Sequence, residues 1–550
     1  MRPLKLPRRL ATRLASHGAR PNALIWQPEP PDKGQSSAAH RMAGGVWLFE
    51  GRLVEAGSNS PWDVEAPDAI WQNALHGQGW LDDAAATQDR QVWNTLSAHV
   101  WSWLEQYGNG AGPGWSPEVV ARRLIRWIAY SSRLLQGRDR VESDAFFNAL
   151  GTQTRFLGWR WREAPEGVER IEALTGLVYA ILSLEGSGVR TDRAVAHLGA
   201  TTRKIVKPDG SIGSRNPEEL ARILALLVWS EETLSAAGLK ASTDHLVAIQ
   251  RASRVVRTLT LPSGALPRFH GGRSGTKLPL ARLSDVSGKA EARNGDAAMG
   301  YLRMSGGTAC LVLDGAQVPV GVHARTGHSS ALAFEFHDRA FPVVVNSGSG
   351  SGFGDSVAIS ARRSEAHSTI ELGERGAGQL TDAKDRRSPA LLSVSGDVSY
   401  RFNQERSGQW ALTESRHYVA RLGLQVERRL HLSADGQRLS GEDTALATDA
   451  ASRARVGALF PSGKESCSMS ARFHLHPDTT VAPTLSGRGI SLTLKDGTLW
   501  VLKTDAEHQE IQPSAYYDED RPQPRATSQI VATTRILDYW GRITWSLERL

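Results

Sequence analysis

The spacing of apolar residues changes near Leu261, and this change limits the folds that the chain can adopt. Before that point the apolar residues recur at helical intervals. Helices are expected around residues 86–105, 146–161, 168–184 and 217–237. Ser116, Pro117 and Glu118 predict the start of another helix, because they supply an N-cap residue, a first-turn proline and an acid at the positive helix end. Many consecutive helices with short connections predict a helical toroid or solenoid.

After Leu261 the apolar residues alternate with polar ones. The clearest series is Leu422, Leu424, Val426, Leu430 and Leu432, and shorter strand-like runs occur at residues 309–313, 491–494 and 500–502. Serial strands with turn residues between them predict an antiparallel β-sandwich. The expected organisation is therefore a basic tail and linker over residues 1–45, a helical domain over 46–261, and a sandwich over 262–550.

Length and composition agree with this organisation. A chain of 550 residues is long enough for two cores, and its two cysteines do not suggest a disulfide framework. The net charge of +7 favours acidic partners, but an anionic polysaccharide, nucleic acid and an anionic lipid surface would suit it equally well. The sequence shows no secretory signal and no apolar run long enough to cross a membrane, so we expect no integral membrane association.

The stretch from residue 323 to 373 contains the clearest candidate site. Two strand-like runs, residues 331–336 and 341–346, predict a hairpin. The polar residues His328, Asn346 and His367 lie just outside it in the sequence. A Gly/Ser-rich loop follows at residues 347–354, and such a loop allows the backbone to approach a ligand closely.

The motifs in this stretch resemble those of the heparinase II/III family of polysaccharide lyases. The resemblance is carried by His328-Ser-Ser-Ala-Leu-Ala-Phe-Glu, by Asn346-Ser-Gly and by His367-Ser-Thr. Ser-Arg-Asn-Pro at residues 214–217 and Phe-His-Leu-His-Pro at residues 473–477 are similar to motifs of the family's proteobacterial branch. The resemblance implies an (α/α) toroid followed by a β-sandwich, and β-elimination of a polysaccharide that contains uronic acid.

The same resemblance bears on partners and location. It implies an anionic polysaccharide as the partner, and no nucleic acid. Members of the family usually act outside the cytoplasm, which favours the periplasm, whereas the missing secretory signal favours the cytoplasm.

A uronate lyase must neutralise the C6 carboxylate, remove the C5 proton and protonate the leaving oxygen. Arg215 and Asn216, at the start of the helix that follows Pro217, have the groups to bind a carboxylate. We expect His328 and Glu166 to complete the catalytic set with them, and Arg170 to bind substrate.

These assignments make two predictions. Arg215 and Asn216 should face His328 across a groove between the two domains. Arg215→Lys should weaken glycan binding or turnover while barely affecting the fold, because an ammonium cannot bind a carboxylate bidentately.

The chain departs from the family at the positions that carry proton transfer. The family's Asn-His pair falls on Pro165-Glu166, its tyrosine on Glu219, and one of its histidines on Thr326. A phenol and a carboxylate differ by about six pKa units, so glutamate cannot replace the tyrosine base without changing the mechanism. The alternative function is therefore a non-catalytic protein that binds or organises an envelope polysaccharide.

The resemblance also implies a possible structural zinc, although no cofactor is required. The family's His, acidic and His ligands correspond to His328, Asn346 and His367. Asparagine brings no charge and a weaker oxygen donor than aspartate, which argues against zinc here.

Tryptophans are frequent in the helical half. Twelve of them are Trp47, Trp62, Trp71, Trp80, Trp93, Trp101, Trp103, Trp115, Trp127, Trp159, Trp161 and Trp229. Indole rings can stack on sugars and offer an N–H to hydroxyl groups, but most tryptophans at helical spacing belong to a core. We expect two or three of these to line a cleft.

Overall fold

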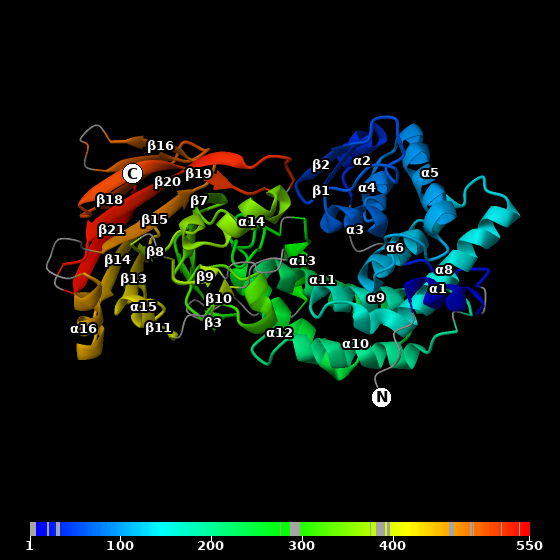
Figure 1. The fold of residues 1–550 in the computed structure, drawn as a ribbon, viewed down its shortest axis with the longest axis horizontal. Helices are drawn as coiled ribbons and strands as arrows, with labels where there is room; N and C mark the ends of the chain where they lie inside the picture. Colours follow the sequence, from blue (N-terminus) through cyan, green and yellow to red (C-terminus); the bar gives the residue numbers. More distant parts are fainter. Residues whose placement is uncertain are drawn as a thin grey trace. The chain divides into compact units, whose positions relative to one another are not determined.

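The computed structural model describes the chain from residue 7 to 550, except residues 19–20, 29–33, 187, 276, 287–296, 374–375, 381–390, 393–395, 461–466, 485–486, 488, 519 and 538. The chain divides into two compact units (Figure 1). The N-terminal unit comprises residues 1–207, 222–251 and 519–522. The C-terminal unit comprises residues 208–221, 252–518 and 523–550.

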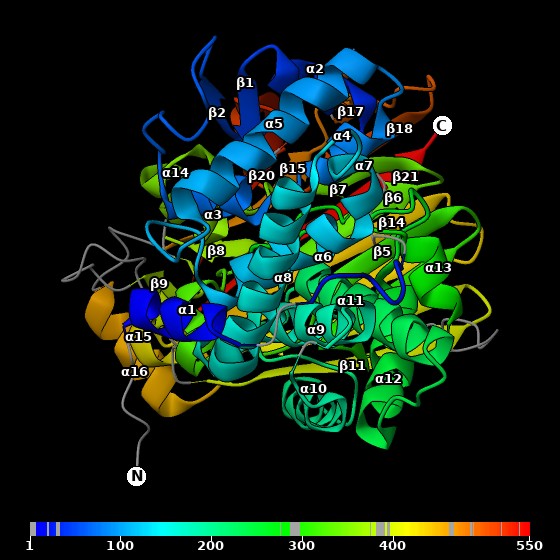
Figure 2. The ribbon, with the colours of Figure 1, turned by 90° about the vertical axis from the view of Figure 1, so that its right-hand side faces the viewer.

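The N-terminal unit is helical. Its helices are α1 (Arg8–Ser16), α2 (Ser36–Ala43), α3 (Ala69–Gly77), α4 (Leu81–Ala86), α5 (Arg90–Tyr107), α6 (Pro117–Ala129), α7 (Ser131–Leu134), α8 (Arg140–Arg160), α9 (Val168–Ser183) and α10 (Thr191–Ile205), with a 3₁₀ turn, η1 (Trp161–Glu163), after α8. Helices α11 (Pro217–Ala236) and α12 (Thr243–Leu259) each run from one unit into the other. Helix α6 packs against α8 and α9 (Figure 2). A hairpin that the apolar spacing did not predict, β1 (Val46–Phe49) and β2 (Arg52–Glu55), also lies in this unit.

Side-chain caps set the starts of the longest helices. The Asp89 carboxylate accepts hydrogen bonds from the first turn of α5, and Asp139 forms a capping box with Glu142 at the start of α8. Ser116 occupies the N-cap position of α6, as predicted, but its hydroxyl makes no capping hydrogen bond. The helix therefore begins there because of Pro117 and Glu118, which follow it.

Most of the twelve tryptophans belong to the core of this unit, as expected. Ten are buried: Trp47, Trp62, Trp71, Trp80, Trp93, Trp103, Trp115, Trp127, Trp161 and Trp229. Trp101 is partly buried. Trp159 is 56% exposed. None of the helices in the described residues is long and apolar enough to cross a membrane.

The described residues of the C-terminal unit form two large antiparallel sheets and a small one, which pairs β9 (Gln379–Leu380) with β10 (Leu391–Leu392). One large sheet has the strand order β11 (Val398–Glu405), β12 (Gly408–Ser415), β13 (Gln425–Ser433), β14 (Arg438–Leu446), β21 (Trp540–Arg549), β18 (Leu499–Thr504), β17 (Ile490–Thr493) and β16 (Thr480–Pro483). The other large sheet has the order β19 (His508–Tyr516), β20 (Arg525–Arg535), β15 (Ser468–Leu475), β7 (Phe341–Val345), β6 (Phe334–Asp338), β5 (Ala309–Asp314), β4 (Tyr301–Gly306) and β3 (Ala297–Ala298), and β8 (Ile370–Leu372) pairs with β15.

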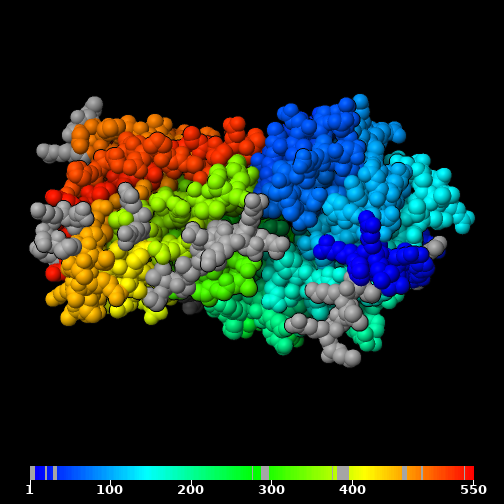
Figure 3. Space-filling view, in the orientation of Figure 1, coloured from blue at the N-terminus to red at the C-terminus, as the bar shows by residue number. Residues whose placement is uncertain are grey.

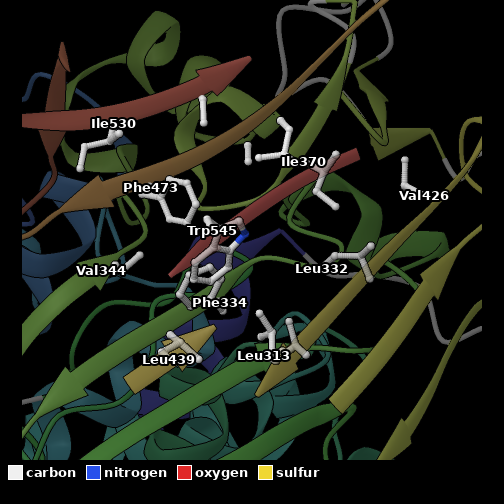
Figure 4. Close-up of a cluster of buried hydrophobic side chains, with 14 of the residues drawn as sticks. Leu313, Leu332, Phe334, Val344, Ile370, Val426, Leu439, Phe473, Ile530 and Trp545 are labelled. Atoms are coloured by element: carbon white, nitrogen blue, oxygen red, sulfur yellow. The ribbon is translucent and has the colours of Figure 1, made fainter. Parts of the chain in front are cut away.

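Side chains from both sheets share one core, so the two sheets form a sandwich. The ring of Phe334 on β6 stacks on Trp545 of β21, with centroids 5.6 Å apart, and Phe473 of β15 contacts the same indole (Figure 4). Phe334 and Val344 are fully buried in this core. The predicted order of a helical half followed by antiparallel sheets is confirmed.

Two predicted strand boundaries are wrong. The first strand of the predicted hairpin begins at Phe334 rather than at residue 331, because Leu332 has a φ of 61°, a left-handed conformation that ends an extended strand. Leu422 lies in a short helix, α15 (Val419–Leu422), which Gly423 ends with a φ of 75°. The alternating series therefore enters β13 only after this turn.

Candidate functional site

The polar centre of the C-terminal unit is built around Arg215. This residue has a φ of 52° in the turn before α11, and its carbonyl accepts a hydrogen bond of 2.5 Å from the Tyr301 hydroxyl. The guanidinium lies 4.7 Å from the centre of the Tyr301 ring and donates to Asp314 Oδ1 at 2.5 Å. Main-chain oxygens accept its other hydrogen bonds: Met299, Gly300, Ala316 and Gln317, at 2.8 to 3.3 Å. All three nitrogens of the guanidinium thus donate within the C-terminal unit.

Asp314, at the end of β5, is the buried counter-charge. Its second oxygen accepts a hydrogen bond of 2.9 Å from the Ser330 hydroxyl and lies 3.5 Å from His270 Nε2. Burial alone would raise the pKa of this carboxyl. The charge of Arg215 and the hydrogen bond with His270 outweigh burial and lower the pKa to about 2. Asp314 is therefore ionised at neutral pH and holds Arg215 in place.

His270 connects this ion pair to His328. Its Nδ1 accepts a hydrogen bond of 3.1 Å from the main-chain N–H of His328, so a neutral His270 carries its proton on Nε2, which faces Asp314. Burial lowers the pKa of His270. The imidazole therefore acts as a neutral link between the two polar groups.

His328 and His367 form a buried imidazole pair. His328 Nδ1 lies 3.2 Å from His367 Nε2, and the planes of the two rings are 66° apart. Burial holds the pKa of His328 well below its usual range, and His367 adds to this effect. Burial likewise lowers the pKa of His367 to about 3. At neutral pH both rings are uncharged, and one donates a hydrogen bond to the other.

Asn346 lies at the end of β7 and is held by two partners. Its side-chain nitrogen donates to Glu335 Oε1 at 3.1 Å, and its oxygen accepts from the main-chain N–H of Ser368 at 3.1 Å. Burial raises the pKa of Glu335 to about 7, although the N–H of Arg268 and the groups of Asn346 favour its charged form. The amide therefore joins the hairpin to the segment that carries His367.

The predicted zinc ligands do not fit a zinc ion. Among the residues that the structure describes, no three His, Cys, Asp or Glu side chains are placed to hold a metal. The predicted set comprises two imidazoles and a carboxamide, and the carboxamide already hydrogen-bonds through both its atoms. Structural zinc takes four ligands from Cys, His and carboxylate groups, so this donor set lacks what zinc requires.

Asn216 caps helix α11. Its side-chain oxygen accepts hydrogen bonds from the N–H groups of Glu218 and Glu219, at 3.0 and 3.2 Å. A Cβ atom on Gly271 would lie 3.9 Å from Asn216 Nδ2 and 3.6 Å from His328 Nε2. Asn216 and His328 thus both lie beside Gly271, within the C-terminal unit.

Glu166 and Arg170 belong to the N-terminal unit. They form an ion pair of 2.7 Å at the start of α9, and the Glu166 side chain is 76% exposed. Arg170 also donates to the carbonyl of Ala164. These contacts close the turn between η1 and α9.

The structure thus brings Arg215, Asn216 and His328 together, but in one connected cluster and not across a groove. Asn216 directly precedes α11, and both it and the Arg215 turn belong to the C-terminal unit instead of the helical half. Asp314, Tyr301, Glu335 and His270 were not among the site residues predicted from the sequence. The Asp-Gly at the end of β5 and the Gly-Gly after His270 were the available signals, since both indicate turns where the chain approaches closely.

This architecture is similar to that of known proteins. Residues 290–546 match the Heparinase II/III-like, C-terminal family. The crystal structure of heparinase III superposes with a TM-score of 0.66 at 14% identity, over 96% of this chain and 86% of that one. A heparan sulfate lyase mutant from Pedobacter heparinus superposes with a TM-score of 0.59 at 14% identity, over 98% of this chain and 87% of that one.

A further similarity is to FtsZ-localized protein C of Caulobacter vibrioides. That protein is 26% identical over 542 residues, which is 96% of this chain and 91% of the relative. The two lyase structures share the whole two-part fold with this chain, while the sequence match to the family covers the sandwich. Residues 290–546 therefore form a heparinase II/III-like C-terminal domain.

Proposed function

We propose that this chain is a non-catalytic protein of the heparinase fold, which binds an anionic envelope glycan and works at the FtsZ-dependent division site. The observation that carries the proposal is the set of hydrogen bonds that Arg215 donates. The guanidinium that was expected to bind a substrate carboxylate donates instead to Asp314 and to four main-chain oxygens.

The groups expected to transfer protons support the same proposal. Glu219, at the family's tyrosine position, lies in the first turn of α11, where its N–H donates to Asn216. His328 is buried, uncharged and paired with His367. A general base must reach the proton that it removes, and a buried imidazole held by another imidazole is poorly placed for that.

The full-length similarity to an FtsZ-localized protein supports a place in cell division. We expect the purified chain to sediment with FtsZ polymers assembled with GTP and to stay in the supernatant when GDP prevents assembly. A fluorescent fusion expressed in Caulobacter vibrioides should follow the FtsZ ring. Equal sedimentation with GTP and GDP, together with a diffuse fusion, would contradict this part of the proposal.

The net charge of +7 and the shared fold support an anionic glycan as the second partner. The test is isothermal titration calorimetry of the full chain with heparan sulfate, alginate and polygalacturonate oligosaccharides. We expect at least one to bind, and binding should weaken as salt screens the charges. Absence of heat with every glycan at low salt would contradict glycan binding.

A second candidate function is retained lyase activity. It is favoured by the imidazole pair of His328 and His367, which stands at family positions on a shared fold. Under this function an unsaturated uronide product would form, and His328→Ala would abolish it while leaving glycan affinity within about tenfold, because a proton-transfer group acts mainly in the transition state.

A further inference from the structure

A groove of about 810 Å³ lies in the N-terminal unit, among residues of α1, α5 and α8. Helix α1, dark blue in Figure 3, covers part of this unit's surface. The volume falls within the range of small-ligand sites, which is roughly 300 to 1,000 Å³. The groove is formed by residues of one unit only.

Two buried polar atoms on residues that line the groove have no hydrogen-bond partner. They are the indole N–H of Trp101 on α5 and the side-chain oxygen of Asn148 on α8. A buried polar group without a partner costs free energy, so such atoms in a groove point to a ligand that supplies the missing hydrogen bonds. One atom is a donor and the other an acceptor, and a sugar hydroxyl can pair with either.

The charges around the groove favour an acidic ligand. Arg9 and Arg13 line it from α1, and neither side chain makes a hydrogen bond or an ion pair with another described residue. Arg138 also lines it and pairs with Glu142 at 2.7 Å. With Glu105 as the second carboxylate, three arginines face two glutamates in the lining.

Arg138 lies over the face of the Trp101 indole. Its guanidinium carbon lies 4.5 Å from the centre of the Trp101 ring, and its side chain is 32% exposed. The ring face is therefore covered, and Trp101 offers its N–H rather than a stacking surface. An acidic group on a ligand can pair with Arg138 in place of Glu142.

We propose that this groove binds an acidic oligosaccharide, with its hydroxyls on Trp101 and Asn148 and its acidic group on the arginines. The inference rests on the proposed glycan binding and assigns it to α1, α5 and α8 of the N-terminal unit. It does not depend on the polar centre around Arg215.

The test compares two variants of the full chain by calorimetry, with the heparan sulfate, alginate and polygalacturonate oligosaccharides. Trp101→Phe removes the indole N–H, and loss of one hydrogen bond should weaken binding about fivefold. Arg9→Gln with Arg13→Gln should weaken binding about tenfold at low salt and reduce its salt dependence. Matched controls are Trp159→Phe, on the exposed tryptophan of α8, and Arg140→Gln with Arg193→Gln, which lie outside the groove.

Melting temperature separates binding from folding. Trp101→Phe also removes ring atoms that pack beside Phe146, so its melting temperature should fall more than that of Trp159→Phe. Arg9→Gln with Arg13→Gln changes two side chains without partners among the described residues, so the melting temperature should match that of the parent while the affinity falls. If a glycan binds the parent chain and both groove variants equally well, the groove inference is overturned and glycan binding stands. If no glycan binds the parent chain, the proposed glycan binding and the groove inference both fail. Binding of an acidic peptide in place of any glycan would also overturn the groove inference.

Discussion

Arg215 shows how a single residue can keep its position while its role differs from the one its motif suggests. The Ser-Arg-Asn-Pro motif predicts a guanidinium that is available to a carboxylate. In the structure that carboxylate is the chain's own Asp314, and the remaining donors meet main-chain oxygens around Gly300 and Gln317. The residue thus links the start of α11 to the start of β4 and the end of β5.

The contacts of Arg215 lead to a different prediction from the one made from the sequence, in which Arg215→Lys barely affects the fold. Lysine keeps the charge but cannot make the forked hydrogen bonds, so several buried oxygens would lose their donor. We expect Arg215→Lys to lower the free energy of unfolding by roughly 2–4 kcal/mol. Urea unfolding measures this, and Arg140→Lys, on a side chain that is 94% exposed, is the control. Equal stability of the two variants would show that the network contributes little.

Glu335 makes the stability of the folded chain depend on pH. Its pKa is raised to about 7 from an ordinary value of 4.5, so between these values the unfolded chain releases a proton that the folded chain keeps. Stability therefore falls as pH rises through this window. Glu335→Gln should remove this loss, and its melting temperature should fall less than the parent's between pH 5 and pH 8. Parallel melting curves for parent and variant would contradict the assignment.

At the scale of elements, the hairpin of β6 and β7 is where the sheets and the polar centre meet. Phe334 points into the sandwich core, where it stacks on Trp545, while its strand neighbour Glu335 hydrogen-bonds Asn346. The alternation of a strand thus places core and polar centre on opposite faces of β6.

Phe334→Ala should be strongly destabilising, because it empties a fully buried site between the two sheets. We expect a loss of about 3–5 kcal/mol in the free energy of unfolding. Chemical denaturation is the measurement, and Tyr400→Ala, on a 40% exposed side chain of β11, is the control. A loss no larger than that of the control would mean that the core packs differently around Trp545.

The elements could be predicted well and the polar centre only in part, for a physical reason. Local apolar spacing is enough to predict helices such as α9 and α11, and their predicted bounds agree with the structure within about one residue. The partners of Arg215 come from segments about 85 to 100 positions away, and no local pattern records them. The sequence could not reveal that main-chain oxygens accept the hydrogen bonds of this guanidinium.

At the scale of the whole molecule, the chain retains the fold of heparinase III while its polar centre is occupied by its own groups. The departures at Glu219 and Thr326 agree with that centre, because neither supplies the phenol or the imidazole that the family uses. A fold can persist when its site has changed, since the sandwich core and the helical packing do not depend on the catalytic groups.

We propose that this chain binds an anionic glycan without cleaving it, and the ultraviolet absorbance of an unsaturated uronide tests this proposal. The full chain would be incubated with the glycan that it binds most tightly, with heparinase III on heparan sulfate as the positive control. We predict that absorbance stays at the level of the protein-free sample through many hours at saturating glycan. A steady rise in absorbance that is proportional to protein concentration and lost in His328→Ala would contradict the account and establish a lyase.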